Sequence, residues 1–398
     1  MRMSSKVPQK NLFNHSLPLL EPFFNGNEWK YVKECLDTGW VSSRGQFVEQ
    51  FEKKVAQYTG AKYAVATVNG TTALHIAMLV LGIKPDEEVL VSNLAFVAPA
   101  NAIRYCQAVP VLIDADPETW QMDVGKVKHF LEHECERQGK QVRNKRSGRN
   151  IRAILPVHVL GLACAMDRIV LLAREYGLHV IEDAAEGMGI KIDGVHVGTI
   201  GDIGVLSFNG NKIVTAGGGG MVLTNDSAKA EYAKYLSTQA KDDSIESIHN
   251  EIGYNYRLNN LQAAVGLAQL EQIDAFLEKK RKIAKYYEEK LRKITRISLM
   301  PSVKNIDSNF WLYTVLLRES TSLTERKEIV RMLNHRGIGS RPIWCPISDL
   351  PPYQDCQAYS IKNSPSLYRR GISLPSSVGL DESELAFCVK VAQEVLLS

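Results

Sequence analysis

Apolar and polar positions follow two different periods along this chain. Short apolar runs, which are typical of buried strands, alternate with stretches in which apolar residues recur every three or four positions, as on one face of a helix. The pattern predicts strands at residues 63–68, 88–92, 109–114, 151–157, 179–182, 203–206 and 220–224, with helices at 73–81, 97–105, 124–134 and 166–176. Because the strands are apolar on both faces and alternate with helices, we expect an α/β domain in which helices cover both sides of a mostly parallel sheet.

Segments of other character flank this unit. Residues 1–30 form a polar, proline-rich arm, and helical spacing predicts helices at 28–37 and 47–58. A long helical pattern over 256–284 lacks a sustained heptad, which favours a helix that connects two domains over a coiled coil. A second unit, with a strand at 311–317 and a helix at 323–336, begins near residue 299. We therefore predict the arm and a large domain at 1–265, and the connecting helix with a smaller α+β domain at 266–398.

A basic segment between residues 137 and 152 interrupts the large domain. It has almost no apolar residues and carries seven cationic ones, namely Arg137, Lys140, Arg143, Lys145, Arg146, Arg149 and Arg152. Such a segment predicts a solvated loop or hairpin. Two interpretations remain: a flap that attracts an anion such as a diphosphate, or an exposed loop with no ligand. Nucleic-acid binding is disfavoured because no aromatic residues that could stack on bases are interleaved.

Composition narrows the class of protein. The 398 residues, 45% hydrophobic and 23% charged, are typical of a globular chain, and a formal net charge of +4 favours neither nucleic acid nor a membrane as a partner. The seven cysteines lack a Cys-x-x-Cys pair and the nine histidines lack ligand spacing, so we expect reduced thiols and no metal site. No apolar run is long enough for a signal peptide or a membrane span, and we expect a cytoplasmic protein.

The stretch from Ser207 to Gly220 places candidate chemistry at the end of a predicted strand. Lys212 lies within it, ahead of four consecutive glycines. Taken alone, this is better read as an ordinary solvated lysine beside a flexible turn. A catalytic lysine attacks a carbonyl only when it is deprotonated, which requires a partly desolvated site and further groups around it.

Those further groups are present for pyridoxal 5′-phosphate (PLP). This cofactor requires a carboxylate that keeps its pyridine nitrogen protonated, and Asp183 ends a predicted strand. Amides and hydroxyls at a helix N-terminus hold a phosphate, and a Gly-Thr-Thr run at 70–72 opens a helix. A flat side chain stacks on the ring, and Phe96 follows another strand. Each residue alone is explained by capping or packing, but their joint placement predicts a PLP site.

Six motifs carry a family resemblance. They are NGTTALH (69–75), PVH (156–158), EDAAE (182–186), SFNGNK (207–212), GGGG (217–220) and GYNYR (253–257). In this order they resemble the DegT-type nucleotide-sugar aminotransferases, PLP enzymes of fold type I, over nearly the whole chain from about Leu17 to Leu374. The resemblance implies a large three-layer domain with a mostly parallel sheet and a smaller α+β C-terminal domain.

The resemblance also implies roles for individual residues. Lys212 would hold PLP as a Schiff base and move protons, and Asp183 would pair with the pyridine nitrogen; both are the predicted catalytic residues. His158 and Glu186 would lie near the substituents of the cofactor, although many relatives carry Gln or His in place of Glu186. The remaining cofactor-binding residues are Phe96 on the ring and, around the phosphate, Gly70, Thr71, Thr72, Ser207 and, from the neighbouring subunit, Asn255. An obligate homodimer with shared active sites follows.

The implied reaction transfers an amino group from glutamate to a nucleotide-linked keto sugar, in amino-sugar biosynthesis for cell-surface polysaccharide. Runs at 24–30, 38–43 and 207–212 resemble most the branch that aminates C4 of UDP-4-keto-6-deoxy-N-acetylglucosamine. GDP-perosamine-type and 3-keto sugars are the alternatives. Candidate substrate contacts are Trp40, Arg257 and Arg341, and no catalytic role is assigned to the loop at 344–350.

Two other protein classes remain as rivals. A nicotinamide dehydrogenase would need a Gly-x-Gly-x-x-Gly turn, and Gly187-Met188-Gly189 lacks the third glycine. A non-catalytic binding protein with the PLP fold would be expected to lose the lysine or the aspartate, and both are present.

Overall fold

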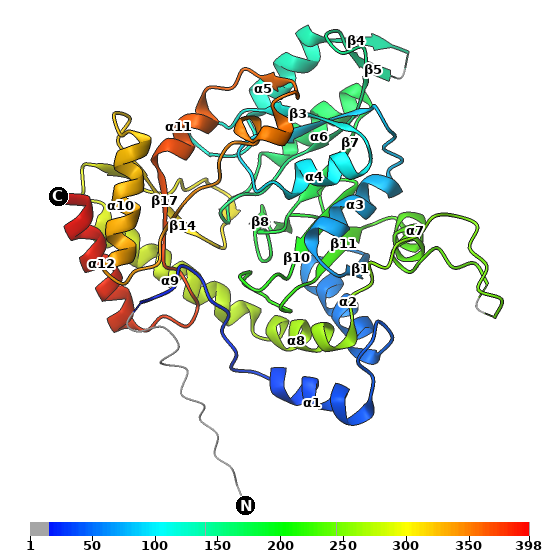
Figure 1. Ribbon diagram of the computed structural model, residues 1–398, viewed down its shortest axis with the longest axis horizontal. Coiled ribbons are helices and arrows are strands. Elements are labelled where there is room, and N and C mark those ends of the chain that lie inside the picture. The colour runs from blue at the N-terminus through cyan, green and yellow to red at the C-terminus, as the bar shows by residue number, and fades with distance from the viewer. Residues whose placement is uncertain (1–15, 140, 244, 398) are drawn as a thin grey trace, which may run out of the picture.

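The computed structural model describes residues 16–139, 141–243 and 245–397 (Figure 1). Most of the predicted N-terminal arm, residues 1–15, lies outside the described part. The described end of the arm packs against the C-terminal half, where Leu17 forms a bridge with Ile338. Among the described residues, no helix is both long enough and apolar enough to cross a membrane.

The large sheet follows the order β1-β11-β10-β7-β6-β2-β3-β16. Its strands are β1 (Tyr63–Thr67), β2 (Glu88–Ser92), β3 (Val109–Ile113), β6 (Asn150–Leu155), β7 (His179–Asp183), β10 (Ile203–Ser207), β11 (Gly220–Thr224) and β16 (Ala358–Tyr359). Pairs from β10 through β16 are parallel, whereas β11 runs antiparallel to both β10 and β1. The predicted mostly parallel sheet is therefore confirmed, with an antiparallel edge next to the lysine loop.

Helices cover both faces of this sheet. They are α2 (Gln46–Thr59), α3 (Gly70–Val80), α4 (Ala98–Tyr105), α5 (Val124–His129), α6 (Met166–Tyr176) and α7 (Ser227–Ser237), whereas α1 (Glu28–Thr38) packs against the helix at Asn260–Leu270. Alternate strand residues enter different cores: Val89 and Val91 of β2 pack in one cluster, and Leu90 packs in another. Because successive side chains of a strand point to opposite faces, this alternation confirms three layers. The helix predicted at 124–134 ends at His129, and a π-helical turn, Phe130–Glu134, follows.

The basic segment forms a hairpin of β4 (Cys135–Gln138) and β5 (Gln141–Asn144). Strand β5 pairs with the start of β6, so the hairpin lies at the amino ends of the parallel strands, at the top of Figure 1. Arg137 lies 4.4 Å over the Tyr176 ring, and Arg149 lies 3.8 Å from Asp86. The prediction of a loop or hairpin is thus correct, but this edge is opposite to the one that carries Lys212, which does not fit a flap over that site.

The C-terminal half contains a second, antiparallel sheet in the order β12-β14-β17-β15. Its strands are β12 (Ile297–Ser298), β14 (Tyr313–Leu317), β15 (Arg341–Pro342) and β17 (Gly371–Leu374), and its helices are α10 (Leu323–His335), α11 (Asn363–Arg370) and α12 (Glu382–Leu397). Short 3-10 turns occupy Ile347–Asp349 and Pro351–Tyr353. A small three-stranded sheet joins β8 (Lys191–Ile192) and β9 (Val195–His196) to β13 (Ile306–Asp307).

The connection between the two halves differs from the prediction. The helical pattern at 256–284 forms two helices, α8 (Asn260–Leu270) and α9 (Ile273–Leu291), rather than one. The Asn259 side chain caps α8 by accepting the Gln262 N–H, which fixes its start. The chain also crosses the boundary near residue 265 more than once, since β16 returns to pair with β3 of the large sheet. The two predicted domains therefore exchange segments.

Candidate active site

A cavity of about 390 Å³ lies at the carboxyl ends of β7 and β10. Of the residues singled out in the sequence, it brings together Gly70, Thr71, Phe96, Asp183, Glu186, Ser207, Lys212 and Arg341. In open α/β sheets, ligands bind outside the carboxyl ends of the strands, and this cavity is at that position. Seven of these side chains or backbone positions come from the large domain, and Arg341 comes from β15 of the small sheet.

Lys212 lies in the loop between the antiparallel neighbours β10 and β11. A hydrogen bond from the Phe208 N–H to the Gly219 carbonyl, at 2.9 Å, closes the base of this loop. Gly219 has a φ of +115°, which a residue with a side chain rarely adopts. A Cβ on Gly220 would lie 2.4 Å from the Asn69 carbonyl oxygen, so this glycine lets the returning strand pass against the start of α3. The glycine run therefore shapes the loop that carries the amine.

The amine of Lys212 is mostly buried between an acid and an aromatic ring. Its Nζ lies 3.5 Å from Oε1 of Glu186 and 4.0 Å from the centroid of the Trp311 ring. The Glu186 carboxyl is buried, and its Oε2 accepts the Leu160 N–H at 2.8 Å. Burial raises the pKa of Glu186 to about 7, against the opposing effect of Lys212. A lysine and a carboxyl that titrates near neutrality thus share one site, an arrangement suited to moving a proton.

Asp183 is the second buried acid in the cavity. One of its oxygens accepts the Ala185 N–H at 3.0 Å. Burial raises its pKa, and the positive charge of Lys212 acts in the opposite direction. A carboxylate in such a place favours a positively charged partner, because that partner offsets the cost of desolvation.

The N-terminus of α3 forms another wall of the cavity. The Asn69 side chain caps the helix by accepting the Thr72 N–H at 2.8 Å, and the Thr72 hydroxyl donates to the Asn69 carbonyl. Thr72 is thus engaged in the cap and does not line the cavity, unlike Thr71 and Ser207. A Cβ on Gly70 would lie 3.0 Å from the Ser207 Cβ, so the glycine allows this close approach. A helix N-terminus beside a hydroxyl suits a phosphate.

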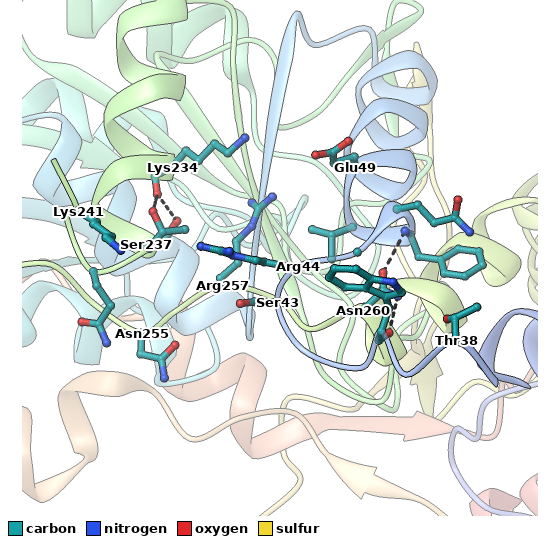
Figure 2. Close-up of a pocket in the computed structure, with 17 residues that line it drawn as sticks. Thr38, Ser43, Arg44, Glu49, Lys234, Ser237, Lys241, Asn255, Arg257 and Asn260 are labelled. Atoms are coloured by element: carbon teal, nitrogen blue, oxygen red, sulfur yellow. Dashed lines mark hydrogen bonds between the residues drawn. The ribbon is translucent and has the colours of Figure 1, made fainter. Parts of the chain in front are cut away.

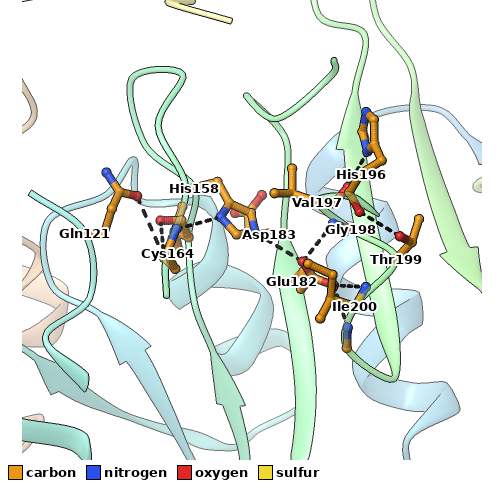
Figure 3. Close-up of polar contacts among 12 residues, drawn as sticks. Gln121, His158, Cys164, Glu182, Asp183, His196, Val197, Gly198, Thr199 and Ile200 are labelled. Carbon is orange, nitrogen blue, oxygen red and sulfur yellow. Dashed lines mark hydrogen bonds and ion pairs between the residues drawn. The ribbon is translucent and has the colours of Figure 1, made fainter. Parts of the chain in front are cut away.

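His158 does not line the cavity. It is fully buried, with Nε2 at 3.3 Å from the Glu182 carboxylate and Nδ1 accepting the Cys164 N–H at 3.1 Å (Figure 3). Glu182 also accepts the backbone N–H groups of Gly198, Ile200 and Gly201. The expected position of His158 near the substituents of the cofactor stays a prediction; in the structure, His158 supports the strand end from within the core.

Three other predicted residues line a separate cavity of about 1040 Å³ (Figure 2). These are Trp40, Asn255 and Arg257. The Arg257 guanidinium pairs with both carboxylate oxygens of Glu52, one of them at 3.1 Å, so its charge is already matched within the chain. Asn255 does not line the cavity that holds Lys212 of its own chain.

Two tryptophans were missed by sequence reasoning. Trp311 and Trp344 both line the Lys212 cavity, and their rings stack with centroids 6.2 Å apart and planes 8° apart. Trp311 was assigned to a strand and Trp344 to a loop without a role. The loop itself is held by Asn93, whose side chain bonds the backbone and hydroxyl of Ser348. A tryptophan flanking a predicted strand carries no signal that distinguishes a cavity wall from a core position.

The residues present fit PLP. The cavity contains an amine for a carbonyl, an acid for a pyridine nitrogen, a helix N-terminus with a serine for a phosphate, and Phe96 as a flat side chain that is 56% exposed. No group of His, Cys, Asp and Glu side chains suited to a metal ion occurs among the described residues. The donor set therefore agrees with the cofactor expected from the sequence.

Comparisons with known proteins agree with this geometry. The profile of the DegT/DnrJ/EryC1/StrS aminotransferase family matches residues 24–392. GDP-perosamine synthase of Caulobacter vibrioides is 39% identical over 377 residues, covering 94% of this chain and 97% of that protein. The putative pyridoxal phosphate-dependent aminotransferase EpsN of Bacillus subtilis is 38% identical, with 94% of each chain covered. A crystal structure of a family member from Brucella abortus superposes with a TM-score of 0.84 at 28% identity, covering 92% of this chain and 95% of that one.

GDP-perosamine synthases of three bacteria match at 36–39% identity. The UDP-linked branch of the sequence analysis stays a prediction. The predictions of the fold, the enzyme class and the cofactor are confirmed. The chain belongs to the DegT/DnrJ/EryC1/StrS aminotransferase family, whose cofactor is pyridoxal 5′-phosphate.

Proposed function

We propose that this protein moves an amino group from glutamate to C4 of a nucleotide-linked keto sugar, with PLP attached to Lys212. The observation that carries the proposal is the position of the Lys212 amine, 3.5 Å from a buried carboxyl in a cavity that also holds Asp183 and the N-terminus of α3. Bound PLP supplies an electron sink for the carbanion that forms when the donor loses its α proton.

Each residue of the cavity has a role in this proposal. Lys212 anchors the cofactor and, once freed, moves the proton. Asp183 would accept a hydrogen bond from the protonated pyridine nitrogen, and its burial would strengthen that pairing. Gly70, Thr71 and Ser207 would hold the phosphate. Glu186 would hold a proton beside the ring, since its pKa is about 7.

The substrate proposal rests on the relatives rather than on the cavity. Three of them are named GDP-perosamine synthase, so we propose the GDP-linked keto-sugar precursor of perosamine first. UDP-4-keto-6-deoxy-N-acetylglucosamine is the second candidate, supported by the sequence runs at 24–30 and 38–43. Arg341 is the proposed contact for the anionic part of either substrate, because it lines the same cavity from the other sheet.

A second copy of the chain is part of the proposal. Asn255 lies in the other cavity, where Arg44 and Lys234 add positive charge. In a homodimer with shared active sites, this surface would face the phosphate of the partner's cofactor. Analytical ultracentrifugation together with an Asn255→Ala variant tests this arrangement: the variant should remain a dimer and bind PLP more weakly.

Replacement of the lysine tests the proposal as a whole. The purified protein should be yellow, and Lys212→Ala should lose the visible absorbance band of the attached cofactor. Its turnover should fall by about 100- to 10,000-fold. Lys282→Ala, which removes an exposed lysine of α9, is the matched control and should keep both. A visible band that persists unchanged in Lys212→Ala would refute the attachment site.

A panel of keto sugars tests the substrate. The protein is mixed with glutamate and with UDP-, dTDP- or GDP-linked 4-keto and 3-keto sugars, and amino-sugar products are detected by mass spectrometry. The proposal expects the GDP-linked 4-keto sugar to react fastest. Amination of the UDP-linked sugar alone would support the second candidate, and no product from any member would refute amino transfer to a nucleotide sugar.

A further inference from the structure

The segment Asn309–Phe310–Trp311 enters the large domain from the C-terminal half. Asn309 is fully buried, and its Nδ2 donates to the backbone carbonyls of Glu186 at 2.8 Å and Met188 at 2.9 Å. Its Oδ1 accepts the Trp311 N–H at 2.9 Å. Phe310 has a φ of +47°, a left-handed conformation that turns the chain sharply here. The segment is therefore docked on the backbone that carries Glu186.

This docking fixes the indole of Trp311 against the lysine loop. The indole Nε1 donates to the Asn211 carbonyl at 2.8 Å, and the Lys212 Nζ lies 4.0 Å from the ring centroid. Trp311 is 4% exposed. A cation at this distance over the face of an indole is attracted by the negative face of the ring. Trp311 thus contacts the atom to which we assign covalent attachment.

A buried lysine holds the other side of the same residue. Lys280 of α9 is 1% exposed, and its Nζ donates to the Trp311 carbonyl at 2.8 Å, to the Ser376 carbonyl and to the Ser376 hydroxyl at 2.9 Å. All three acceptors are neutral oxygens, and burial lowers the pKa of Lys280 well below its usual value. The Ser376 hydroxyl also lies 3.2 Å from the Trp311 carbonyl. Burial of a lysine among neutral groups is costly, but removal of its amine would leave the buried carbonyls of Trp311 and Ser376 without this donor.

We propose that Lys280 is a positioning residue, which holds the Trp311 indole over Lys212 so that the ring stabilises positive charge on the lysine nitrogen. This inference rests on the proposed attachment of PLP to Lys212. Charged groups that face this nitrogen in the cavity are Glu186 and Asp183, which attract the same charge, and Arg341, which opposes it. The Trp311 indole also attracts the positive charge on this nitrogen, and it does not titrate itself.

The pH titration of the visible band of the holoenzyme measures this effect. The band reports protonation of the nitrogen of Lys212 in its attached form. Removal of the ring in Trp311→Leu should lower the apparent pKa of the band by about 0.5, because a cation–π contact of ordinary strength corresponds to about a threefold change in the proton equilibrium. An unchanged pKa in a folded, cofactor-bound Trp311→Leu variant would overturn the inference.

Lys280→Met tests the positioning step. It should lower the apparent pKa in the same direction, and the double variant with Trp311→Leu should show no further shift, because both changes act through one ring. Tyr287→Phe is the matched control: Tyr287 lies on the same helix and donates to the Pro375 carbonyl at 2.8 Å, beside Ser376. This control should lower the melting temperature without a change in the band.

Different measurements test the role of Lys280 and the attachment of the cofactor to Lys212. If Lys280→Met does not fold, Ser376→Ala removes an oxygen shared by Lys280 and Trp311 and should lower the pKa by a smaller amount. A Lys280 or Ser376 variant that keeps the wild-type pKa while Trp311→Leu shifts it would refute the positioning role. Failure of the attachment site is read independently, from persistence of the visible band in Lys212→Ala.

Discussion

Two neighbouring acids at the end of β7 occupy opposite environments. Glu182 and Asp183 are both buried, and their side chains point to opposite faces because they are adjacent in a strand. Burial penalises the charge on Glu182, but His158 and the N–H groups of Gly198 and Gly201 outweigh it and lower its pKa. The pKa of Asp183 is raised instead, since burial outweighs its hydrogen bond from Ala185.

The difference separates structure from function. The oxygens of Glu182 are satisfied by the protein itself, so its charge serves the loop at 196–201 and the core (Figure 3). Asp183 lines the cavity and gains most from a cationic partner that enters it. Burial and charge alone would not distinguish the two residues; the origin of their hydrogen bonds does.

The largest effect is expected from Glu182→Gln. The amide would place N–H donors against the backbone donors or against His158, which leaves buried groups unpaired. We expect a loss of about 3–5 kcal/mol in the free energy of unfolding. Urea unfolding of the variant and the wild type, followed by circular dichroism, measures it. A loss below about 1 kcal/mol would show that the network is not the structural element described here.

Asp183→Asn should lower turnover rather than stability. Loss of the carboxylate opposite the pyridine nitrogen is expected to lower turnover by about 100- to 1,000-fold, the usual range for a preorganised electrostatic contact. Stability should change by less than about 1 kcal/mol, because a desolvated charge is removed at the same time. Steady-state kinetics and the same urea experiment provide both numbers. A stability loss as large as that of Glu182→Gln would abolish the contrast between the two acids.

Sequence reasoning was strongest where local pattern and cofactor chemistry coincide. The strands and the positions of Asp183, Ser207 and Lys212 follow from apolar runs that end in polar residues, and parallel strands bring such ends together. It does not reach the contacts that long-range packing decides. Whether His158 faces the cavity or Glu182 depends on the loop at 198–201, and the approach of Trp311 depends on Lys280 and Asn309. Neither set of contacts leaves a periodic signal in the chain.

Glu186→Gln tests whether the other buried acid of the cavity makes stability depend on pH. The folded pKa of about 7 lies above the unfolded value of 4.5, so the folded state binds the proton more tightly. Glu186 therefore contributes stability that is fully present below about pH 4.5 and is lost as the pH rises through about 7. Over this pH range and without added cofactor, the wild type should lose about 2–3 kcal/mol more free energy of unfolding than Glu186→Gln. Melting temperatures of the two proteins measure this difference. Parallel pH profiles for the two proteins would contradict this.

The smallest effect is expected at the opposite edge of the sheet. Arg149 belongs to the basic segment at 137–152, between β5 and β6, and lies 3.8 Å from the exposed Asp86. Arg149→Gln should change the free energy of unfolding by less than about 0.5 kcal/mol and leave KM for the nucleotide sugar unchanged. A raised KM would bring back the interpretation of this hairpin as an anion-attracting flap.

The two walls of the Lys212 cavity can form at different times during synthesis of the chain. The ends of the loop that carries Lys212 are joined by the pairing of Ser207 with Gly220, so the amine reaches its place through contacts that are short in sequence. Trp311 and Arg341 line the same cavity but follow Lys212 by about a hundred residues or more in the chain. Because chains are synthesised from the N-terminus and their parts fold largely as units, the cofactor side of the cavity can form on the ribosome before the wall that faces it.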